Sequence, residues 1–423
     1  SSPRARVVAA ALCTAFPAER LMRAMINADK NAEVIYIDVI CAARYGAAIE
    51  IIDQVLAGTP AEKALTTWAR RSRFAGSKDR AAIRDHVFDV LRRKRSVGVW
   101  GGGVTGRAMI LGLIRQQGID PASIFSGEGH APEGLSRAEQ TAGHPAEGAD
   151  ALDLPDWLLP EVTQSLGDKT EAYGEVLRHR APVLLRVNSR KLDRNAAIAK
   201  LSDEGISAVT ADVAPTALRV VEGARRINNS EAYRKGLVEL QDGASQAVVE
   251  ALPLRDGLRI LDLCAGGGGK SLAMAGKVNG SFYAYDAHPQ RLRDLPERAK
   301  RAGVKITLTK SPEAEAPFDL VLSDVPCSGS GSWRRSPEGK WALTEEKIQD
   351  LNRLQDEILK RAASLLAPGG TLAYATCSVF ERENTARVDQ FLTQNPAFAA
   401  TFQKTWIPGD DGDGFHLSIL TGV

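Results

Sequence analysis

The hydrophobic positions in the N-terminal part of the chain follow a helical period. Over residues 42–56 apolar side chains recur at every third or fourth position, until Gly58-Thr-Pro60 interrupts the pattern. Ile83, Val87 and Leu91 keep the same spacing further along. Such spacing places the apolar side chains on one face of a helix. We therefore expect an all-α domain over residues 41–125.

The middle of the chain loses this period. Residues 126–155 are rich in Gly, Pro and Ala and show no periodicity, which is typical of a linker or a partly ordered loop. Residues 182–188 and 218–221 have the apolar character of short strands, and residues 196–201 that of a helix. We expect an acidic linker over residues 126–155, followed by a small intermediate α+β domain over residues 156–240.

Beyond residue 257, short apolar runs alternate with helical stretches, the longest of which covers about residues 344–366. This alternation is typical of a doubly wound α/β domain with a parallel sheet covered on both faces. Ligands bind such sheets beyond the carboxyl ends of the strands. We expect this domain over residues 241–423, with strands at residues 259–264, 281–286, 305–310, 320–325 and 371–376.

Composition fits a globular chain of several domains. The chain has 423 residues, of which 44% are hydrophobic, and 54 basic residues face 52 acidic ones, for a net charge of +2. That balance excludes a disordered or fibrous protein. The net charge of the whole chain is an average over segments of opposite charge. Residues 66–96 hold ten Lys or Arg against three Asp, whereas residues 126–156 hold seven acids and one Arg.

A basic face on a small helical domain favours a polyanion such as RNA, although a charge run is also what a solvated helix face contains. We expect RNA contacts from Arg70, Arg71, Arg73, Lys78, Arg80, Arg92, Arg93 and Lys94, and from Arg186 in the intermediate domain.

The termini and the cysteines indicate a cytoplasmic protein. Residues 1–40 form an extension of uncertain structure, in which Arg4 and Arg6 precede an apolar run without a clear signal-cleavage site. No run of 18 apolar residues is present to span a membrane. The five cysteines have neither disulfide-framework nor zinc-ligand spacing, so we expect reduced thiols, no metal and a monomer. For Cys13 and Cys41 no further role is expected.

A glycine loop at residues 261–271 joins the first strand of the α/β domain to a helix, which suits close approach to a ligand. The phosphate-binding loop pattern fails because Cys264 occupies its first glycine position. The dinucleotide fingerprint is incomplete because Ser271 replaces its third glycine. The third option is S-adenosylmethionine, whose sites use an acid at the strand end, here Asp262. Asp286, at the end of the next strand, suits the two hydroxyls of a ribose, and it fits NAD as well as it fits S-adenosylmethionine.

Two further strand ends carry Asp324 with Cys327, and Cys377. Because neighbouring strand ends lie about 5 Å apart, we expect both thiols to face one cleft. A thiolate that adds to C6 of cytosine makes C5 nucleophilic enough to accept a methyl group, and an acid such as Asp324 assists at N3. This chemistry does not decide which of the two cysteines attacks.

These segments resemble the NOL/NOP/Sun family of RNA cytosine-C5 methyltransferases, and most closely its bacterial RsmB-like (Fmu-like) small-subunit rRNA members. The resemblance covers about the last 180 residues. It rests on Gln241-Asp-Gly-Ala-Ser-Gln246, Asp262-Leu-Cys-Ala-Gly-Gly-Gly-Gly-Lys270, Asp324-Val-Pro-Cys-Ser-Gly329, Arg334-Arg-Ser-Pro-Glu-Gly-Lys-Trp341, Ala375-Thr-Cys-Ser378 with Glu383-Asn384, and Asp413-Gly-Phe-His416.

The resemblance implies a Rossmann-like class I methyltransferase domain with a mostly parallel seven-stranded sheet, behind a NusB-like helical domain. It also implies that Cys377 is the nucleophile, that Cys327 assists product release and that Asp324 contacts the base. The residues implied to hold S-adenosylmethionine are Asp262, Cys264, Ala265, Gly266, Gly267, Gly268, Gly269, Lys270, Asp286 and Asp324.

The chain departs from the family pattern at two points. Gly267 stands where the family has Pro, and Lys310-Ser311 stands where it has Gly-Asp, so we assign no residue to the adenine. The substrate implied is RNA, with 16S rRNA favoured and tRNA as the alternative. An RNA-binding assembly factor with an inactive methyltransferase domain, or a nicotinamide-dependent oxidoreductase, are the competing hypotheses. The oxidoreductase has no use for two strand-end thiols.

Overall fold

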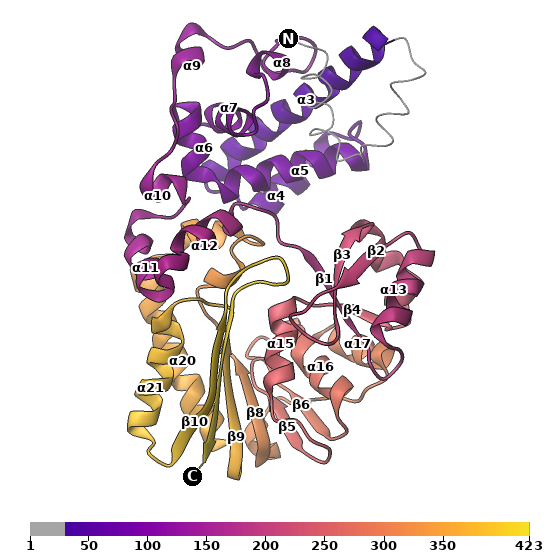
Figure 1. Ribbon diagram of the computed structural model, residues 1–423, viewed down its shortest axis with the longest axis vertical. Coiled ribbons are helices and arrows are strands. Elements are labelled where there is room, and N and C mark those ends of the chain that lie inside the picture. Colours follow the sequence, from indigo (N-terminus) through magenta and orange to yellow (C-terminus); the bar gives the residue numbers. More distant parts are fainter. Residues whose placement is uncertain (1–29, 423) are drawn as a thin grey trace. The chain divides into compact units, whose positions relative to one another are not determined.

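The computed structural model describes residues 30–422, and the chain divides into two compact units between Leu159 and Pro160 (Figure 1). Most of the predicted extension, including Cys13, lies outside the described residues. The same holds for the side chains that precede Ala42, Cys41 among them.

The N-terminal unit is helical, as predicted. Its core consists of fully buried side chains such as Ile51, Val87 and Ile110. The helices are α3 (Lys30–Leu56), α4 (Ala61–Arg71), α5 (Ser77–Arg92), α6 (Lys94–Gly101), α7 (Gly106–Gln116) and α8 (Pro121–Ile124). Helices α6 and α7 pack closely because Gly112 has no side chain, since a Cβ there would lie 1.8 Å from the carbonyl oxygen of Val97. Among the described helices none alone has the length and apolarity of a membrane span, and α6 with α7 passes that test only as a pair bent by 92°.

Residues 126–155 do not form a free linker, which corrects the prediction. They contain α9 (Arg137–Thr141) and α10 (Gly148–Ala151) and are bonded to the helical unit. Arg107 Nε donates to Glu139 Oε1 at 2.6 Å. Asp153 is fully buried and accepts from the backbone N–H and the hydroxyl of Ser96, both at 2.8 Å. The acids that indicated a solvated segment are thus partners for arginines and helix ends.

The second unit begins with two helices and a small antiparallel sheet in the order β2-β3-β1-β4. Leu185, Leu201 and Leu218 fill its core. The elements are α11 (Leu159–Leu166), α12 (Thr170–Leu177), β1 (Val183–Val187), α13 (Arg194–Asp203), β2 (Ser207–Thr210), β3 (Ala217–Glu222), α14 (Glu231–Arg234) and β4 (Val238–Leu240). These residues form the intermediate α+β domain that the apolar runs predicted.

A seven-stranded sheet in the order β10-β11-β9-β8-β5-β6-β7 forms the rest of this unit (Figure 1). The strands from β5 to β9 pair in parallel, whereas β10 and β11 are antiparallel. All five predicted strands are present, although β7 has only two residues, and β10 and β11 were not among the five. The strands are β5 (Arg259–Asp262), β6 (Ser281–Ala284), β7 (Thr307–Leu308), β8 (Phe318–Asp324), β9 (Leu366–Thr376), β10 (Phe398–Trp406) and β11 (Phe415–Gly422).

Helices cover both faces of the sheet. Side chains of α15 (Gly243–Ala251) and α16 (Gly269–Lys277) pack with one set of alternate strand positions, and α17 (Leu295–Ala302) lies beside α16. Side chains of α20 (Glu345–Ser364) and α21 (Thr385–Gln394) pack with the other set. The short helices α18 (Pro312–Glu315) and α19 (Pro337–Ala342) lie in connections. Because β5, β6, β8 and β9 run in parallel, the residues that follow them meet at one edge of the sheet.

Candidate active site at the carboxyl ends of the strands

Asp262 ends β5 in a buried position, 1% exposed. Ser271 Oγ donates to its Oδ2 at 2.6 Å, whereas its Oδ1 has no hydrogen-bond partner within the described structure. Burial raises the pKa of Asp262 to about 7. A buried acceptor without a partner is uncommon in folded proteins and is normally satisfied by a bound molecule.

The glycine loop is held open by its neighbours. Gly266 and Gly268 have φ values of 53° and 77°, which side chains rarely adopt. Asp286, 5% exposed, accepts from the backbone N–H of Gly266 at 2.9 Å and from that of His288 at 2.8 Å. At Gly267, which replaces the family's proline, the carbonyl accepts from the Arg298 guanidinium. The loop therefore takes its shape from bonds to its backbone rather than from a proline ring.

Lys270 and Asp324 form an ion pair that links the loop to the end of β8. Lys270 Nζ donates to Asp324 Oδ2 at 2.6 Å, and it lies 4.3 Å from the centre of the Phe415 ring. The lysine side chain is 8% exposed and the aspartate side chain 27%. Asp324 is thus partly exposed at the end of β8 and is held there by the buried lysine.

The two strand-end thiols meet, as the strand order predicted. Cys327 Sγ and Cys377 Sγ lie 3.3 Å apart, and both residues are partly exposed. The hydrogen bond with Cys377, burial and the charge of Glu383 raise the pKa of Cys327 well above its usual value. The two sulfurs lie within hydrogen-bond distance of each other, and either thiol can be the donor. Cys264 is also present in the loop, and burial raises the pKa of its thiol.

Glu383 connects the residues that follow the two thiols. It is fully buried, and its Oε2 accepts from the hydroxyls of Ser328 and Ser378, both at 2.5 Å. Its Oε1 accepts from the backbone N–H of Ser328 at 2.8 Å and from Gln355 Nε2 at 3.1 Å. Since Ser328 follows Cys327 and Ser378 follows Cys377, one carboxylate fixes both loops. The sequence pattern included Glu383 in a motif but gave it no role.

Arg186 is not a solvent-facing RNA contact, which corrects the prediction. It is 9% exposed and donates to Gln241 Oε1 at 2.5 Å and to the carbonyl of Gly269 at 2.8 Å, and burial lowers its pKa to about 10. Arg186 and Gln241 instead hold the far end of the glycine loop. Sequence reasoning missed this role because an arginine within an apolar strand is the only signal for it.

Of the predicted RNA contacts in the helical unit, Arg92 must also be corrected, because it is 6% exposed and pairs with Asp89 at 3.0 Å. Arg93 and Lys94 are half-buried. The members that are exposed are Arg70, Arg71, Arg73, Lys78 and Arg80.

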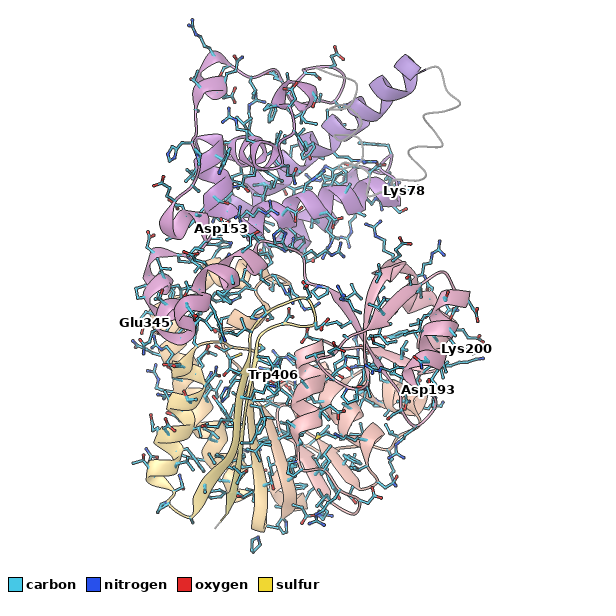
Figure 2. The ribbon with its side chains drawn as sticks, in the orientation of Figure 1. Lys78, Asp153, Asp193, Lys200, Glu345 and Trp406 are labelled. Carbon is cyan, nitrogen blue, oxygen red and sulfur yellow. The ribbon has the colours of Figure 1, made fainter. Side chains whose placement is uncertain are left out.

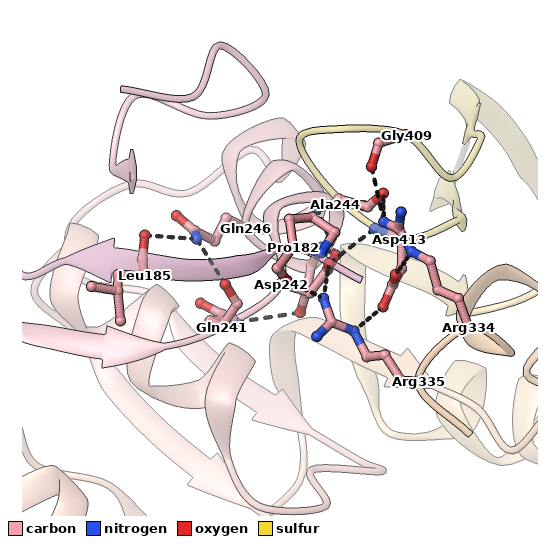
Figure 3. A network of polar contacts seen from close by, with 12 residues as sticks. Pro182, Leu185, Gln241, Asp242, Ala244, Gln246, Arg334, Arg335, Gly409 and Asp413 are labelled. Carbon is pink, nitrogen blue, oxygen red and sulfur yellow. Dashed lines mark hydrogen bonds and ion pairs between the residues drawn. The ribbon is translucent and has the colours of Figure 1, made fainter. Parts of the chain in front are cut away.

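A second polar network brings together three of the quoted motifs without reaching the thiols (Figure 3). Arg334 Nε donates to Asp413 Oδ1 at 2.7 Å, and both side chains are 4% exposed. Arg335 donates to Asp413 and, at 3.0 Å, to Asp242 Oδ1, which also accepts from the Asp413 N–H at 2.9 Å. This network fixes the start of α15 against the loop before β11. Among the described residues no group of three or more His, Cys, Asp or Glu could hold a metal.

Comparisons with known proteins match this architecture. The family described as 16S rRNA methyltransferase RsmB/F matches residues 249–413, and the ferredoxin-like domain of RsmF/B-like methyltransferases matches residues 154–228. Ribosomal RNA small subunit methyltransferase B of Salmonella arizonae is 33% identical over 303 residues, which are 68% of this chain and 70% of that protein. The protein of the same name from Enterobacter sp. is 35% identical over 287 residues, 63% of this chain and 66% of that protein. The matches thus span about two thirds of these relatives.

Among solved structures, one titled PH0851 has a TM-score of 0.70 at 25% identity and covers 90% of this chain and 98% of its own. NSun6 from Pyrococcus horikoshii with SFG has a TM-score of 0.56 at 20% identity, over 64% of this chain and 98% of its own, which supports the fold alone.

The mostly parallel seven-stranded sheet, with a glycine loop and acids at its carboxyl edge, defines a Rossmann-like methyltransferase domain. With the sequence matches added, the chain belongs to the RsmB/F family of 16S rRNA methyltransferases. The cofactor of this class is S-adenosylmethionine, and the site fits it. Asp262 Oδ1 is a buried acceptor without a partner, suited to an ammonium group, and the carboxylate of Asp286 suits ribose hydroxyls.

Proposed function

We propose that this chain methylates C5 of a cytosine in RNA, with 16S rRNA as its favoured substrate, through a covalent bond between Cys377 and C6 of the base. The observation that carries the proposal is the 3.3 Å separation of the Cys327 and Cys377 sulfurs. An oxidoreductase or a binding module has no need of two thiols at adjacent strand ends within hydrogen-bond distance of each other.

The short distance between the two sulfurs supports different roles for the two thiols. Cys377 attacks C6 as the thiolate, because the S–H of Cys327 donates to it and stabilises its negative charge. A water molecule from the solvent takes the C5 proton, and the same hydrogen bond then stabilises Cys377 as the leaving group. Cys327 therefore assists release of the product.

Asp324 and Lys270 serve the base in this proposal. Asp324 would contact the target base and assist at N3, as the sequence led us to expect. Lys270, which donates to Asp324 at 2.6 Å, would hold its carboxylate in position. Asp262, Asp286 and the loop from Cys264 to Lys270 would hold S-adenosylmethionine, which supplies the electrophilic methyl group when bound. Glu383 would hold the loops that carry Cys327 and Cys377 in fixed positions relative to each other.

The helical unit is proposed to be a NusB-like RNA-binding domain, on the support of its all-α core and its exposed cations. The target cytosine must leave any stacked helix to reach the thiols.

The proposal is tested by mapping 5-methylcytosine in undermodified 16S rRNA and in tRNA after incubation with the protein and S-adenosylmethionine. We expect one or few modified cytosines in 16S rRNA and none with Cys377→Ala. Methylation by Cys377→Ala at the wild-type rate would refute the covalent mechanism, and modification of tRNA alone would refute the substrate.

A further inference from the structure

The turn between α4 and α5 presents an aromatic ring to solvent. Phe74 is 86% exposed, more than any other large hydrophobic side chain in the described part of the chain. On either side of it Ser72 and Ala75 are buried, and the Ala75 N–H donates to the Ser72 carbonyl at 3.1 Å. The turn is thus anchored at both sides of the exposed ring.

The surface around Phe74 is cationic. The acids between Ala61 and Arg84 are Glu62 and Asp79, and both are engaged: Arg84 Nη1 donates to Glu62 at 2.6 Å and Arg44 Nη2 to Asp79 at 2.8 Å. Both acids of the segment are therefore paired with arginines, one of which, Arg44, comes from α3. The exposed cations nearest to Phe74 in the sequence are Arg70, Arg71, Arg73, Lys78 and Arg80, of which Lys78 is marked at the start of α5 in Figure 2.

Helix stability accounts for only part of this charge. Arg70 and Arg71 lie in the last turn of α4, where cations interact favourably with the helix dipole. Lys78 and Arg80 lie at the start of α5, where the dipole disfavours a cation. A single exposed apolar side chain needs no explanation by itself. A ring surrounded by cations, some of them placed against the helix dipole, is what a ligand with both phosphates and flat faces requires.

We propose that the α4–α5 turn binds unpaired RNA, with Phe74 stacking on one base and Arg73, Lys78 and Arg80 contacting the flanking phosphates. The bases of an A-form duplex are stacked inside it and present no free face, so the partner is a loop, bulge or single strand. The inference rests on the proposed function only in taking RNA as the polyanion. A protein partner would require more apolar surface than one ring provides.

The test is equilibrium binding of the full chain to two labelled RNAs, one unpaired and one a duplex of equal length. Base stacking on an aromatic residue contributes about 1–3 kcal/mol, so Phe74→Ala is expected to weaken binding of the unpaired RNA by about 5- to 100-fold and to leave the duplex unchanged. Phe74→Tyr should retain affinity. Val104→Ala, at a position 76% exposed in the same unit, is the matched control and should change nothing.

The salt dependence of RNA binding distinguishes the contribution of the Phe74 ring from that of the cations. Arg73→Gln and Lys78→Gln should each reduce the slope of log affinity against log salt by about 0.7, whereas Phe74→Ala should lower affinity without changing the slope. Unchanged binding by Phe74→Ala, or an equal loss for duplex RNA, would overturn the inference. Because these measurements need neither S-adenosylmethionine nor catalysis, their failure leaves the proposed methylation standing, and failed methylation leaves them interpretable.

Discussion

The buried carboxylate of Glu383 is expected to control the reactivity of both thiols, although it touches neither the substrate nor a sulfur. It accepts four hydrogen bonds, from the N–H and hydroxyl of Ser328, the hydroxyl of Ser378 and the amide of Gln355. Glu383→Ala leaves these donors without an acceptor in a fully buried position. Hydrogen bonds to a charged group contribute about 1.5–3 kcal/mol each and are not additive, so we expect a loss of stability on the order of 3–5 kcal/mol.

Glu383→Gln is the more informative variant. Its side chain has the same shape, and the two serine hydroxyls can rotate to accept from the new amide. The negative charge that helps to raise the pKa of Cys327 is lost. We expect kcat at saturating RNA to fall about 10- to 100-fold, because a misplaced group costs about 100-fold per ångström. The pH dependence of kcat should also shift toward lower pH, as Cys327 ionises more readily.

The assay is methyl transfer to RNA measured across pH, together with binding of S-adenosylmethionine, which the Glu383 variants should not alter. Glu345→Gln is the matched control, since this glutamate forms an exposed ion pair with Arg382 and its loss should cost less than about 1 kcal/mol and no activity. A Glu383→Gln enzyme with wild-type kcat and an unshifted pH profile would show that the carboxylate is not needed to position the thiols.

Three further predictions concern burial and charge. Burial raises the pKa of Asp262 to about 7, so the protonated carboxyl contributes its full stability below pH 4, and this stability is lost as pH rises to 7. In urea unfolding, Asp262→Asn should therefore raise the free energy of unfolding by up to about 4 kcal/mol at pH 8 and leave it unchanged at pH 4. In calorimetry the same variant should bind S-adenosylmethionine more weakly. Burial lowers the pKa of His416 to about 4, so stability should fall by up to about 3 kcal/mol as pH drops from 6.5 to 4, and His416→Asn should flatten that limb. Arg334→Met should cost about 3 kcal/mol, because Asp413 is buried and then keeps only Arg335 of its two arginine partners. Asp413→Leu in the same chain should restore part of the loss; equal losses in the single and double variants would contradict this.

The sequence predicted the parts of the fold that depend on local pattern. Apolar runs identified the five strands of the parallel sheet because such strands are buried on both faces. Strand β10 was not predicted because it is an edge strand with mostly exposed residues and no apolar run. Similarly, α3 begins at Lys30, before the apolar spacing that indicated a helix.

In the candidate site, too, some residues could be placed from the sequence and others could not. The thiols and Asp324 could be placed together because parallel strand ends meet at one edge, whatever the loops do. The contact between Lys270 and Asp324, the role of Glu383 and the burial of Arg186 depend on how loops distant in sequence fold over that edge. Charge patterning likewise could not separate Arg92, which is buried beside Asp89, from Arg73, which is exposed in the turn after α4.

The covalent bond between Cys377 and the base is the central step of the proposed mechanism, and it can be trapped. The Cys327→Ala variant, incubated with 16S rRNA and S-adenosylmethionine, should accumulate a protein–RNA adduct that survives denaturing electrophoresis, and peptide mass spectrometry should place the nucleotide on Cys377. Adding Cys377→Ala to the same chain should abolish the adduct. A nucleotide found on another residue, or an adduct that persists in the double variant, would contradict the assignment of the nucleophile.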